Sequence, residues 1–227
     1  MAEIETLALG PMENYIHLIV DRPSGKVAVV DPAWEVEKIL ARVEAEGWHV
    51  EWILLTHGHR DHVNGVEALQ AATGAAVYVR QQEVDHFQFQ ERDWSTFEGG
   101  KQWPLGESTI EAIPTPGHTP GGTCYHVGDH LVTGDTLFVY GCGRCDLEGG
   151  DPRQMYHSLQ RLLDLPAHTR IYPGHSYSLQ PTSTLAEERA GNPFLHCEDE
   201  EAFVEYRMVR HDQERESPYG PVPREGG

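Results

Sequence analysis

The chain has 227 residues, of which 39% are hydrophobic and 23% are charged, a composition typical of a globular protein with a sizeable core. Its formal charge of −19, from 17 basic and 36 acidic residues, repels phosphate backbones and anionic lipids, so we expect no nucleic-acid partner and no membrane partner. The N-terminus is acidic and no apolar run is long enough to span a bilayer, which favours a cytoplasmic location.

The first half of the sequence alternates between strand and helix patterns. Residues 15–20 and 26–30 are rich in β-branched side chains and flank D-R-P-S-G, which predicts a hairpin. Residues 34–46 carry apolar side chains at helical spacing and are followed by Gly47, which predicts a helix. The elements predicted next are a strand at 52–55, a helix at 64–72, a strand at 76–79, and a short helix with a long loop within 81–106.

The second half contains further strands and helices, and its last residues are rich in Pro and Gly. Strands are predicted at 109–113, 123–127, 130–132 and 170–172, and helices at 152–163, 185–190 and 200–209. Strands in adjacent groups that also alternate with helices favour a mixed α/β sandwich over a barrel. We expect a main domain at 1–180, a short helical extension packed on it at 181–212, and a flexible tail at 213–227.

A dense group of imidazoles follows the apolar run at 52–55, in the sequence T-H-G-H-R-D-H. His57 and His59 are two residues apart in extended backbone and can face the same way, whereas Asp61 and His62 lie where the next helix begins. A single histidine among the 14 in the chain is usually an ordinary surface or core residue. Imidazole and carboxylate together suit zinc, iron or manganese, so this loop can supply ligands to two metal ions.

Three more candidate ligands lie downstream, each beside a glycine at a strand end or tight turn. His118 stands in T-P-G-H-T-P-G-G, Asp135 in V-T-G-D-T and His175 in Y-P-G-H-S-Y. Glycine lets a loop bring its backbone close to a compact site. Each motif alone is weak, and the ordered set is what indicates a metal site.

The order H-x-H-x-D-H, G-H, G-D and G-H resembles the metallo-β-lactamase superfamily, over roughly residues 12–195. The resemblance implies an α/β fold, an αββα sandwich of two mixed β-sheets flanked by helices, with metals at one edge of the sheets. It implies two divalent metal ions, with zinc favoured and iron or manganese as alternatives. The implied ligands are His57, His59 and His118 for the first metal, Asp61, His62 and His175 for the second, and Asp135 as a bridge between them.

Two other stretches are similar to glyoxalase II within that superfamily. The segment P-T-S-T-L-A-E-E-R-A-G-N-P-F at 181–194 resembles a helix of that enzyme. In G-C-G-R-C-D at 141–146, Arg144 matches a basic residue that binds glutathione, while Asp146 replaces a tyrosine. Tyr177 matches a second glutathione-binding tyrosine, so Arg144 and Tyr177 are the predicted substrate-binding residues.

The sequence leaves two possibilities for the thiol half of the substrate. The C-terminal helical region is shorter than in the glutathione enzyme and offers no clear match for its other basic residues. Similar zinc hydrolases of this length accompany polyketide synthases, where the acyl group is held on the phosphopantetheine arm of a carrier protein. The resemblance therefore implies either a small-molecule thioester such as an acyl-glutathione or an acyl group on a carrier protein.

Thioester hydrolysis is the reaction that this resemblance implies. In favourable sites a bound metal lowers the pKa of water from 15.7 to about 7, so a hydroxide between two metals can attack the carbonyl. The metals also stabilise the developing oxyanion. Asp61 and Asp135 are the predicted catalytic residues, Asp61 because it can also orient the water. The chain contains no G-x-S-x-G and no H-E-x-x-H, the motifs of the main rival hydrolases.

Other functions remain as alternatives. A persulfide dioxygenase branch shares G-C-G-R-x-D and holds one iron with residues matching His57, His118 and Asp135, but it usually has P-A-H where this chain has P-G-H at 173–175. A non-catalytic binding protein on the same fold is disfavoured because all seven ligand positions are filled. A β-lactamase proper is disfavoured by the glyoxalase-like segment at 181–194.

The four cysteines of the chain do not form a recognisable framework. They are too few and too scattered for a set of structural disulfides. Cys142 and Cys145 have the spacing of a redox pair, but they lie in a glycine-rich loop rather than at the start of a helix. We therefore expect both to be ordinary small loop residues.

Overall fold

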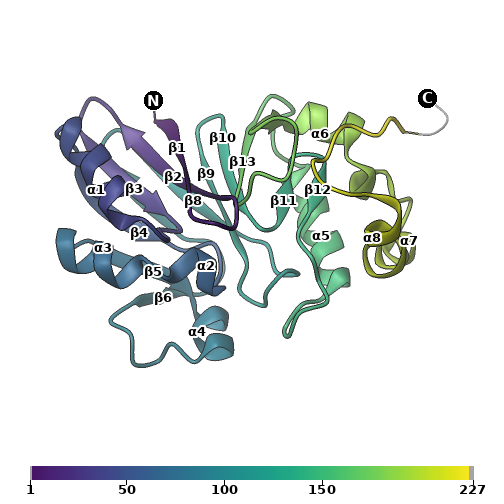
Figure 1. Ribbon diagram of the computed structural model, residues 1–227, viewed down its shortest axis with the longest axis horizontal. Coiled ribbons are helices and arrows are strands. Elements are labelled where there is room, and N and C mark those ends of the chain that lie inside the picture. Colours follow the sequence, from purple (N-terminus) through teal and green to yellow (C-terminus); the bar gives the residue numbers. More distant parts are fainter. Residues whose placement is uncertain (1, 225–227) are drawn as a thin grey trace.

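The computed structural model describes residues 2–224, which form two six-stranded sheets packed face to face (Figure 1). The strands of the first sheet are β1 (Glu3–Leu9), β2 (Asn14–Asp21), β3 (Lys26–Val30), β4 (His49–Leu54), β5 (Ala76–Arg80) and β6 (Ser95–Phe97), in that order. Strands β1 to β3 pair antiparallel and β3 to β6 pair parallel, so the sheet is mixed.

The second sheet is also mixed. Its strands are β7 (Gln102–Leu105), β8 (Ser108–Pro114), β9 (Thr123–Val127), β10 (His130–Gly134), β13 (Arg170–Pro173) and β14 (Ser183–Thr184). Their spatial order is β14-β13-β10-β9-β8-β7, and only β10 and β13 are parallel. A separate small ribbon joins β11 (Leu137–Phe138) to β12 (Gly141–Cys142).

Helices cover the outer face of each sheet, and several further helices follow the last strand of the second sheet. The helices of the first half are α1 (Val36–Ala45), α2 (Arg60–Val63), α3 (Val66–Thr73) and α4 (Gln81–Phe87). Those of the second half are α5 (Pro152–Leu162), α6 (Leu185–Gly191), the 3-10 turn η1 (Pro193–His196), α7 (Glu200–Glu205), the π-helical turn η2 (Tyr206–Arg210) and α8 (His211–Glu214). Figure 1 shows α1 and α3 on one outer side and α5, α7 and α8 on the other.

Strand periodicity produces the layers. Alternate residues of a strand point to opposite faces of its sheet. On β2, Ile16 and Leu18 belong to the core cluster that includes Ile39 of α1, whereas Ile19 belongs to the cluster between the sheets with Tyr125 of β9. A third cluster packs α5 and α7 against the outer face of the second sheet. The predicted αββα sandwich is therefore confirmed.

Several sequence predictions need correction. The strand β1 was not predicted, because its acidic residues mask the apolar alternation of a strand at the edge of a sheet. The segment 81–106 is not a helix followed by a long loop, since it also contributes β6 and β7. The single helix expected at 200–209 is α7 followed by the π-helical turn η2. The predicted hairpin is confirmed as β2 and β3.

The C-terminal segment contacts the rest of the chain beyond α8. The backbone N–H of Tyr219 donates to the carbonyl of Tyr177 at 2.7 Å, and that of Val222 donates to Gly191 at 2.8 Å. Part of the tail expected to be flexible at 213–227 is thus tied to the domain, and residues 225–227 lie outside the described residues. None of the helices within residues 2–224 combines the length and apolar character needed to cross a bilayer.

Candidate metal centre

The predicted ligands come together at the ends of strands that are far apart in sequence. His57 follows β4, Asp135 follows β10 and His175 follows β13. Backbone hydrogen bonds join these ends, since Gly174 N–H donates to the carbonyl of Gly134 at 2.9 Å and Thr123 N–H donates to that of Thr56 at 2.9 Å. The pairing of the strands therefore gathers the loops at one edge of the sandwich.

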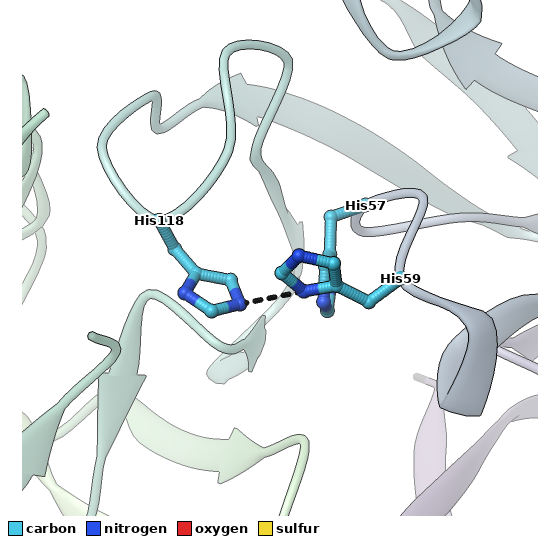
Figure 2. A group of neighbouring side chains, drawn as sticks. All are labelled: His57, His59 and His118. Atoms are coloured by element: carbon cyan, nitrogen blue, oxygen red, sulfur yellow. Dashed lines mark hydrogen bonds between the residues drawn. The ribbon is translucent and has the colours of Figure 1, made fainter. Parts of the chain in front are cut away.

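Three histidines form the first group of donors (Figure 2). The donor nitrogens of His57, His59 and His118 lie within 4.8 Å of one another, and His118 Nε2 is 3.0 Å from His59 Nδ1. The Nε2 atom of His57 is buried and has no hydrogen-bond partner among the described residues. Three imidazole nitrogens converging in this way match a zinc-binding set.

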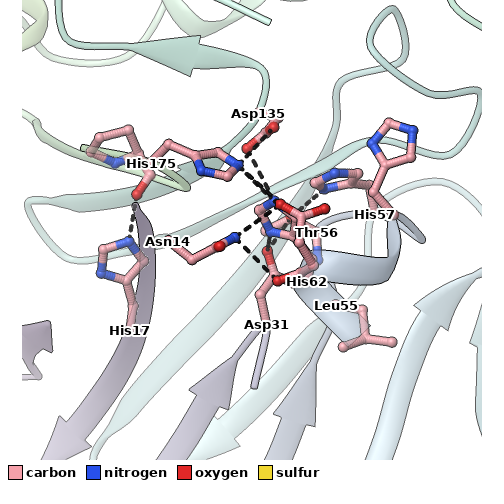
Figure 3. Close-up of polar contacts among 12 residues, drawn as sticks. Asn14, His17, Asp31, Leu55, Thr56, His57, His62, Asp135 and His175 are labelled. Carbon is pink, nitrogen blue, oxygen red and sulfur yellow. Dashed lines mark hydrogen bonds and ion pairs between the residues drawn. The ribbon is translucent and has the colours of Figure 1, made fainter. Parts of the chain in front are cut away.

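Asp61, His62 and His175 form the second group. Figure 3 shows its two histidines beside Asp135. The Nε2 atoms of the two histidines are 3.1 Å apart, and Asp61 Oδ2 is 3.5 Å from His62 Nε2 and 3.4 Å from His175 Nε2. Asp135 lies between the groups. Its Oδ2 atom is 3.4 Å from His175 Nε2 and 3.6 Å from His118 Nε2. Asp135 can therefore contact a cation in either group.

The outer nitrogens of the imidazoles show which lone pairs face inward. His118 Nδ1 contacts the carbonyl oxygen of Arg144 at 2.7 Å, and His175 Nδ1 contacts that of Met12 at 2.9 Å. His62 Nδ1 contacts the Asp31 carboxylate at 3.0 Å. Carbonyl and carboxylate oxygens only accept, so each Nδ1 carries a proton and each ring directs its Nε2 inward.

The positions of these donor atoms show whether the residues fit metal ions. The Nε2 atoms of His62 and His175 are 3.1 Å apart, a separation that requires a cation or a proton between them. Burial without a partner is also costly for His57 Nε2 and for Asp135 Oδ1. Two divalent cations would satisfy all of these atoms, so the donor set fits a two-metal centre.

Electrostatics separates the groups. Burial, reinforced by His62, lowers the pKa of His57 well below its usual value, and burial together with His118 lowers the pKa of His59 to about 4. Burial also lowers the pKa of His62, but Asp135, Asp31 and other acids outweigh it and raise that pKa to about 9. The first group is thus neutral imidazole, the form that binds metal, and the second is rich in carboxylate charge.

A pocket of about 290 Å³ adjoins the centre on the side of Asp135 and His118. Its other walls come from the β11–β12 ribbon, the loop after β13, the turn η2 and the C-terminal segment. The lining residues outside the metal-ligand set are Phe138, Cys142, Arg144, Tyr177, Arg207, His211, Asp212 and Tyr219. The two predicted substrate-binding residues, Arg144 and Tyr177, therefore line the same cavity.

The family assignment follows from a sequence match to this architecture. The family model of the metallo-beta-lactamase superfamily matches residues 9–175, the stretch that carries every predicted ligand. The chain belongs to this superfamily. The predicted resemblance is therefore confirmed.

Curated relatives within the superfamily include two kinds of hydrolase. A probable polyketide biosynthesis zinc-dependent hydrolase, BaeB of Bacillus velezensis, is 40% identical over 201 residues, which cover 88% of this chain and 89% of the relative. A hydroxyacylglutathione hydrolase of Pseudomonas entomophila is 40% identical over 205 residues, which cover 88% of this chain and 74% of the relative. The chain is similar to both across most of its length.

Solved structures share the fold of this superfamily member. ETHE1 from Myxococcus xanthus is 30% identical with a TM-score of 0.83, covering 91% of this chain and 90% of that chain. TTHA1623 in a di-iron-bound form is 32% identical with a TM-score of 0.73, covering 84% of this chain and 100% of that chain. The second structure holds two metals, and they are iron.

Supporting residues of this superfamily member were missed by the sequence analysis. Asp31, directly after β3, accepts from the backbone N–H and hydroxyl of Thr56 and contacts His62. Asn14 Nδ2 donates to the carbonyl and to Oδ2 of Asp61, both at 3.1 Å. Neither residue type nor its spacing signals such a role, because the partners are distant in sequence.

The cysteines near the pocket are free thiols. Burial raises the pKa of Cys142 well above its usual value and raises that of Cys145 to about 12. The thiolate is the reactive form of cysteine, so these buried side chains are poorly suited to redox or nucleophilic chemistry. This agrees with the expectation that both are ordinary loop residues.

Proposed function

We propose that this protein is a dinuclear metal-dependent thioester hydrolase. The observation that carries the proposal is the pair of inward-facing donor groups connected by Asp135, with the Nε2 atoms of His62 and His175 only 3.1 Å apart. One metal would be held by His57, His59 and His118, and a second by Asp61, His62 and His175, with Asp135 contacting both. Similarity to BaeB and to a hydroxyacylglutathione hydrolase supports hydrolysis as the reaction class.

The chain's own residues supply orientation and access. When bound, two such cations provide a water of lowered pKa and polarise a carbonyl group. The carboxylate of Asp61 is 15% exposed and is held by Asn14, so it can orient a water molecule in the site. A thiolate is a fair leaving group, so no protein acid is needed for its departure. The pocket beside Asp135 can receive the thiol arm.

The charges of the pocket favour a neutral thiol arm. Arg144 forms a two-pronged ion pair with Asp146, at 2.8 and 2.7 Å, and Arg207 donates to Asp212 at 3.1 Å. Both cations are thus already paired. Glutathione brings two carboxylates that would compete with these aspartates, whereas the amides of a pantetheine arm are uncharged. We therefore assign the phosphopantetheine arm of a carrier protein as the substrate's thiol half.

The test is thiol release by protein of measured metal content. One acyl group is offered on glutathione and on pantetheine, and kcat/KM is compared. We expect hydrolysis of both, with pantetheine preferred. A preference for glutathione would overturn the assignment of the thiol half, and no release from either by fully loaded protein would overturn the proposed function.

A charge variant sharpens this test. Asp146→Asn frees Arg144, so it should raise kcat/KM for the glutathione thioester relative to the pantetheine thioester. Asp129→Asn is the matched control, because Asp129 is exposed and pairs only with His168, away from the pocket. Equal changes for both thioesters in Asp146→Asn would show that the ion pair does not select the thiol arm.

A mononuclear iron persulfide dioxygenase is the second candidate, favoured by the similarity to ETHE1. It would use His57, His118 and Asp135 and would leave the second donor group without a role. Oxygen uptake with glutathione persulfide by the iron-loaded protein distinguishes this function. We expect none, because the second group is complete and tightly gathered.

A further inference from the structure

Glu83 is a fully buried carboxylate that has no place in the ligand set. It belongs to α4, the short helix at the start of the segment 81–106. Its Oε2 atom accepts from the backbone N–H of Gly58 at 2.6 Å, and its Oε1 atom accepts from that of Gly121 at 2.5 Å. Both hydrogen bonds join α4 to loops that are distant in sequence.

The two glycines occupy the loops that carry the first donor group. Gly58 lies between His57 and His59, and Gly121 lies three residues after His118. One carboxylate therefore bridges both loops. The second donor group uses other supports, namely Asn14 for Asp61, Asp31 for His62 and the carbonyl of Met12 for His175.

The packing around these glycines leaves no space for the loops to shift toward α4. A Cβ atom at Gly121 would lie 2.6 Å from Cγ of Glu83, and a Cβ at Gly58 would lie 2.3 Å from the ring of Phe87. Phe87 is one helical turn after Glu83, and its ring centroid is 5.4 Å from that of His59. Side chains of α4 thus press directly on both loops.

The chemistry of the bridge requires a carboxylate. Two backbone N–H groups point at the side chain, and neither can rotate away or act as an acceptor. A carboxylate offers an oxygen to each of them, whereas glutamine offers one oxygen and turns an NH₂ group toward the other N–H. Replacing Glu83 by glutamine would therefore release one loop while keeping the size of the side chain.

We propose that Glu83 is a positioning residue for the first metal, which sets the spacing of His57 and His59 from His118 without contacting the metal. The inference rests on the proposed two-metal centre but not on the identity of the substrate. Groups that orient metal ligands without touching the metal are typically worth 10- to 100-fold in metal affinity. Loss of the bridge should thus weaken the binding of one metal ion and leave the binding of the other unchanged.

The experiment is a zinc titration of the metal-free protein against a chromophoric chelator, which measures two affinities. In Glu83→Gln we expect one affinity to fall by about 10- to 100-fold and the other to stay at the wild-type value. Glu188→Gln is the matched control, because Glu188 is also fully buried and accepts a backbone N–H, that of Tyr140, but supports no predicted ligand. It should leave both affinities unchanged.

Double variants assign the weakened metal. His175→Ala disables the second group. Adding Glu83→Gln to this variant should still lower the affinity for the zinc ion that remains. Adding it to His118→Ala, which disables the first group, should have no further effect. Wild-type affinities in Glu83→Gln, or an equal loss at both metals, would overturn the inference.

Folding is monitored by circular dichroism, so that loss of structure is not mistaken for loss of a metal. If Glu83→Gln does not fold, the same titrations are carried out on Glu83→Asp, which keeps the carboxylate but shortens its reach. Unchanged affinities in folded Glu83→Asp would then overturn the inference. Wild-type protein that binds a single zinc would instead contradict the two-metal centre itself.

Discussion

The two ends of the candidate active site are built differently. At the metal end, the imidazoles are buried and their outer nitrogens are fixed by carbonyl and carboxylate groups, as for His62 by Asp31 and for His175 by Met12. At the pocket end, the walls include the half-exposed Arg144 and the C-terminal Tyr219. The candidate metal ligands are thus fixed at the ends of sheet strands, whereas the pocket is lined by side chains of loops and of the C-terminal segment.

This difference predicts that substitutions at the two ends should have different effects on metal binding and on substrate affinity. A ligand at the metal end belongs to a network in which each atom has a fixed partner, so removing one leaves the others unsatisfied. A residue in the pocket makes separate contacts, and its loss should change affinity for one part of the substrate. The predictions below test this contrast, beginning with the largest expected effect.

Asp135→Ala should have the largest effect, because Asp135 is the carboxylate within reach of both donor groups. Charge stabilisation by metal ions is worth several kcal/mol, so we expect kcat for thioester hydrolysis to fall by about 10³-fold, with loss of bound metal. Metal analysis and steady-state kinetics measure both. The exposed Asp129→Ala is the control, and activity within about tenfold of wild type in Asp135→Ala would exclude a bridging role.

Gly174→Ala should damage the metal end without removing any ligand. A Cβ at Gly174 would lie 2.4 Å from Asp135 Oδ1 and 3.0 Å from His62 Cε1, so Asp135 would have to move. We expect affinity for a metal to fall by about 10- to 100-fold, as for other disturbances next to metal ligands. Gly100→Ala, whose Cβ would approach Ala112 O at an ordinary 3.4 Å, should be neutral. Unchanged metal binding in Gly174→Ala would show that the site tolerates P-A-H.

The contrast also explains how far the sequence predicts the site. The candidate ligands could be selected because they are histidines and aspartates beside glycines at strand ends, and the structure brings all seven together. Their supports, Asp31 and Glu83, were not predictable, because a buried acid gains its role from partners such as Gly121 that only the fold brings near. The pocket walls from η2 and the C-terminal segment were missed for the same reason.

The fold shows a similar division. Strands with regular apolar alternation, such as β2 and β3, were predicted because their side chains alone define two faces. The edge strand β1 and the short strands β6 and β7 were not, since pairing with a neighbour, rather than side-chain pattern, makes them strands. Sequence reasoning therefore found the core strands and the candidate ligands, but not the edge strands and the supporting residues.

A pH prediction tests the segment at 181–194, which supports the pocket end. Glu188 is buried and accepts hydrogen bonds from Ser183, Asn192 and the backbone of Tyr140, so it anchors the ribbon that carries the pocket wall. Burial raises the pKa of Glu188 from 4.5 to about 7. The folded protein therefore binds the Glu188 proton more tightly than the unfolded chain does. The stabilisation that comes from this proton is fully present below pH 4.5 and is lost as the pH rises to about 7.

The expected size is up to about 3 kcal/mol of unfolding free energy, lost between these two pH values. Glu188→Gln cannot titrate and should lack this component. Urea unfolding of wild type and variant at pH 5 and pH 7.5 measures this component. The difference in unfolding free energy between the two proteins should change between the two pH values. Parallel stability profiles would show that the carboxyl group titrates normally.

Tyr177→Phe should have the smallest effect, because it alters the pocket end alone. The Tyr177 ring stacks on His175 at 4.7 Å and 3°, and phenylalanine keeps that stacking while removing the hydroxyl. His175 also keeps its contact with Met12, so metal content should not change. Loss of one hydrogen bond to substrate, about 1 kcal/mol, should raise KM about fivefold and leave kcat unchanged. A large fall in kcat or in bound metal would instead place Tyr177 at the metal end and remove the boundary between the two regions.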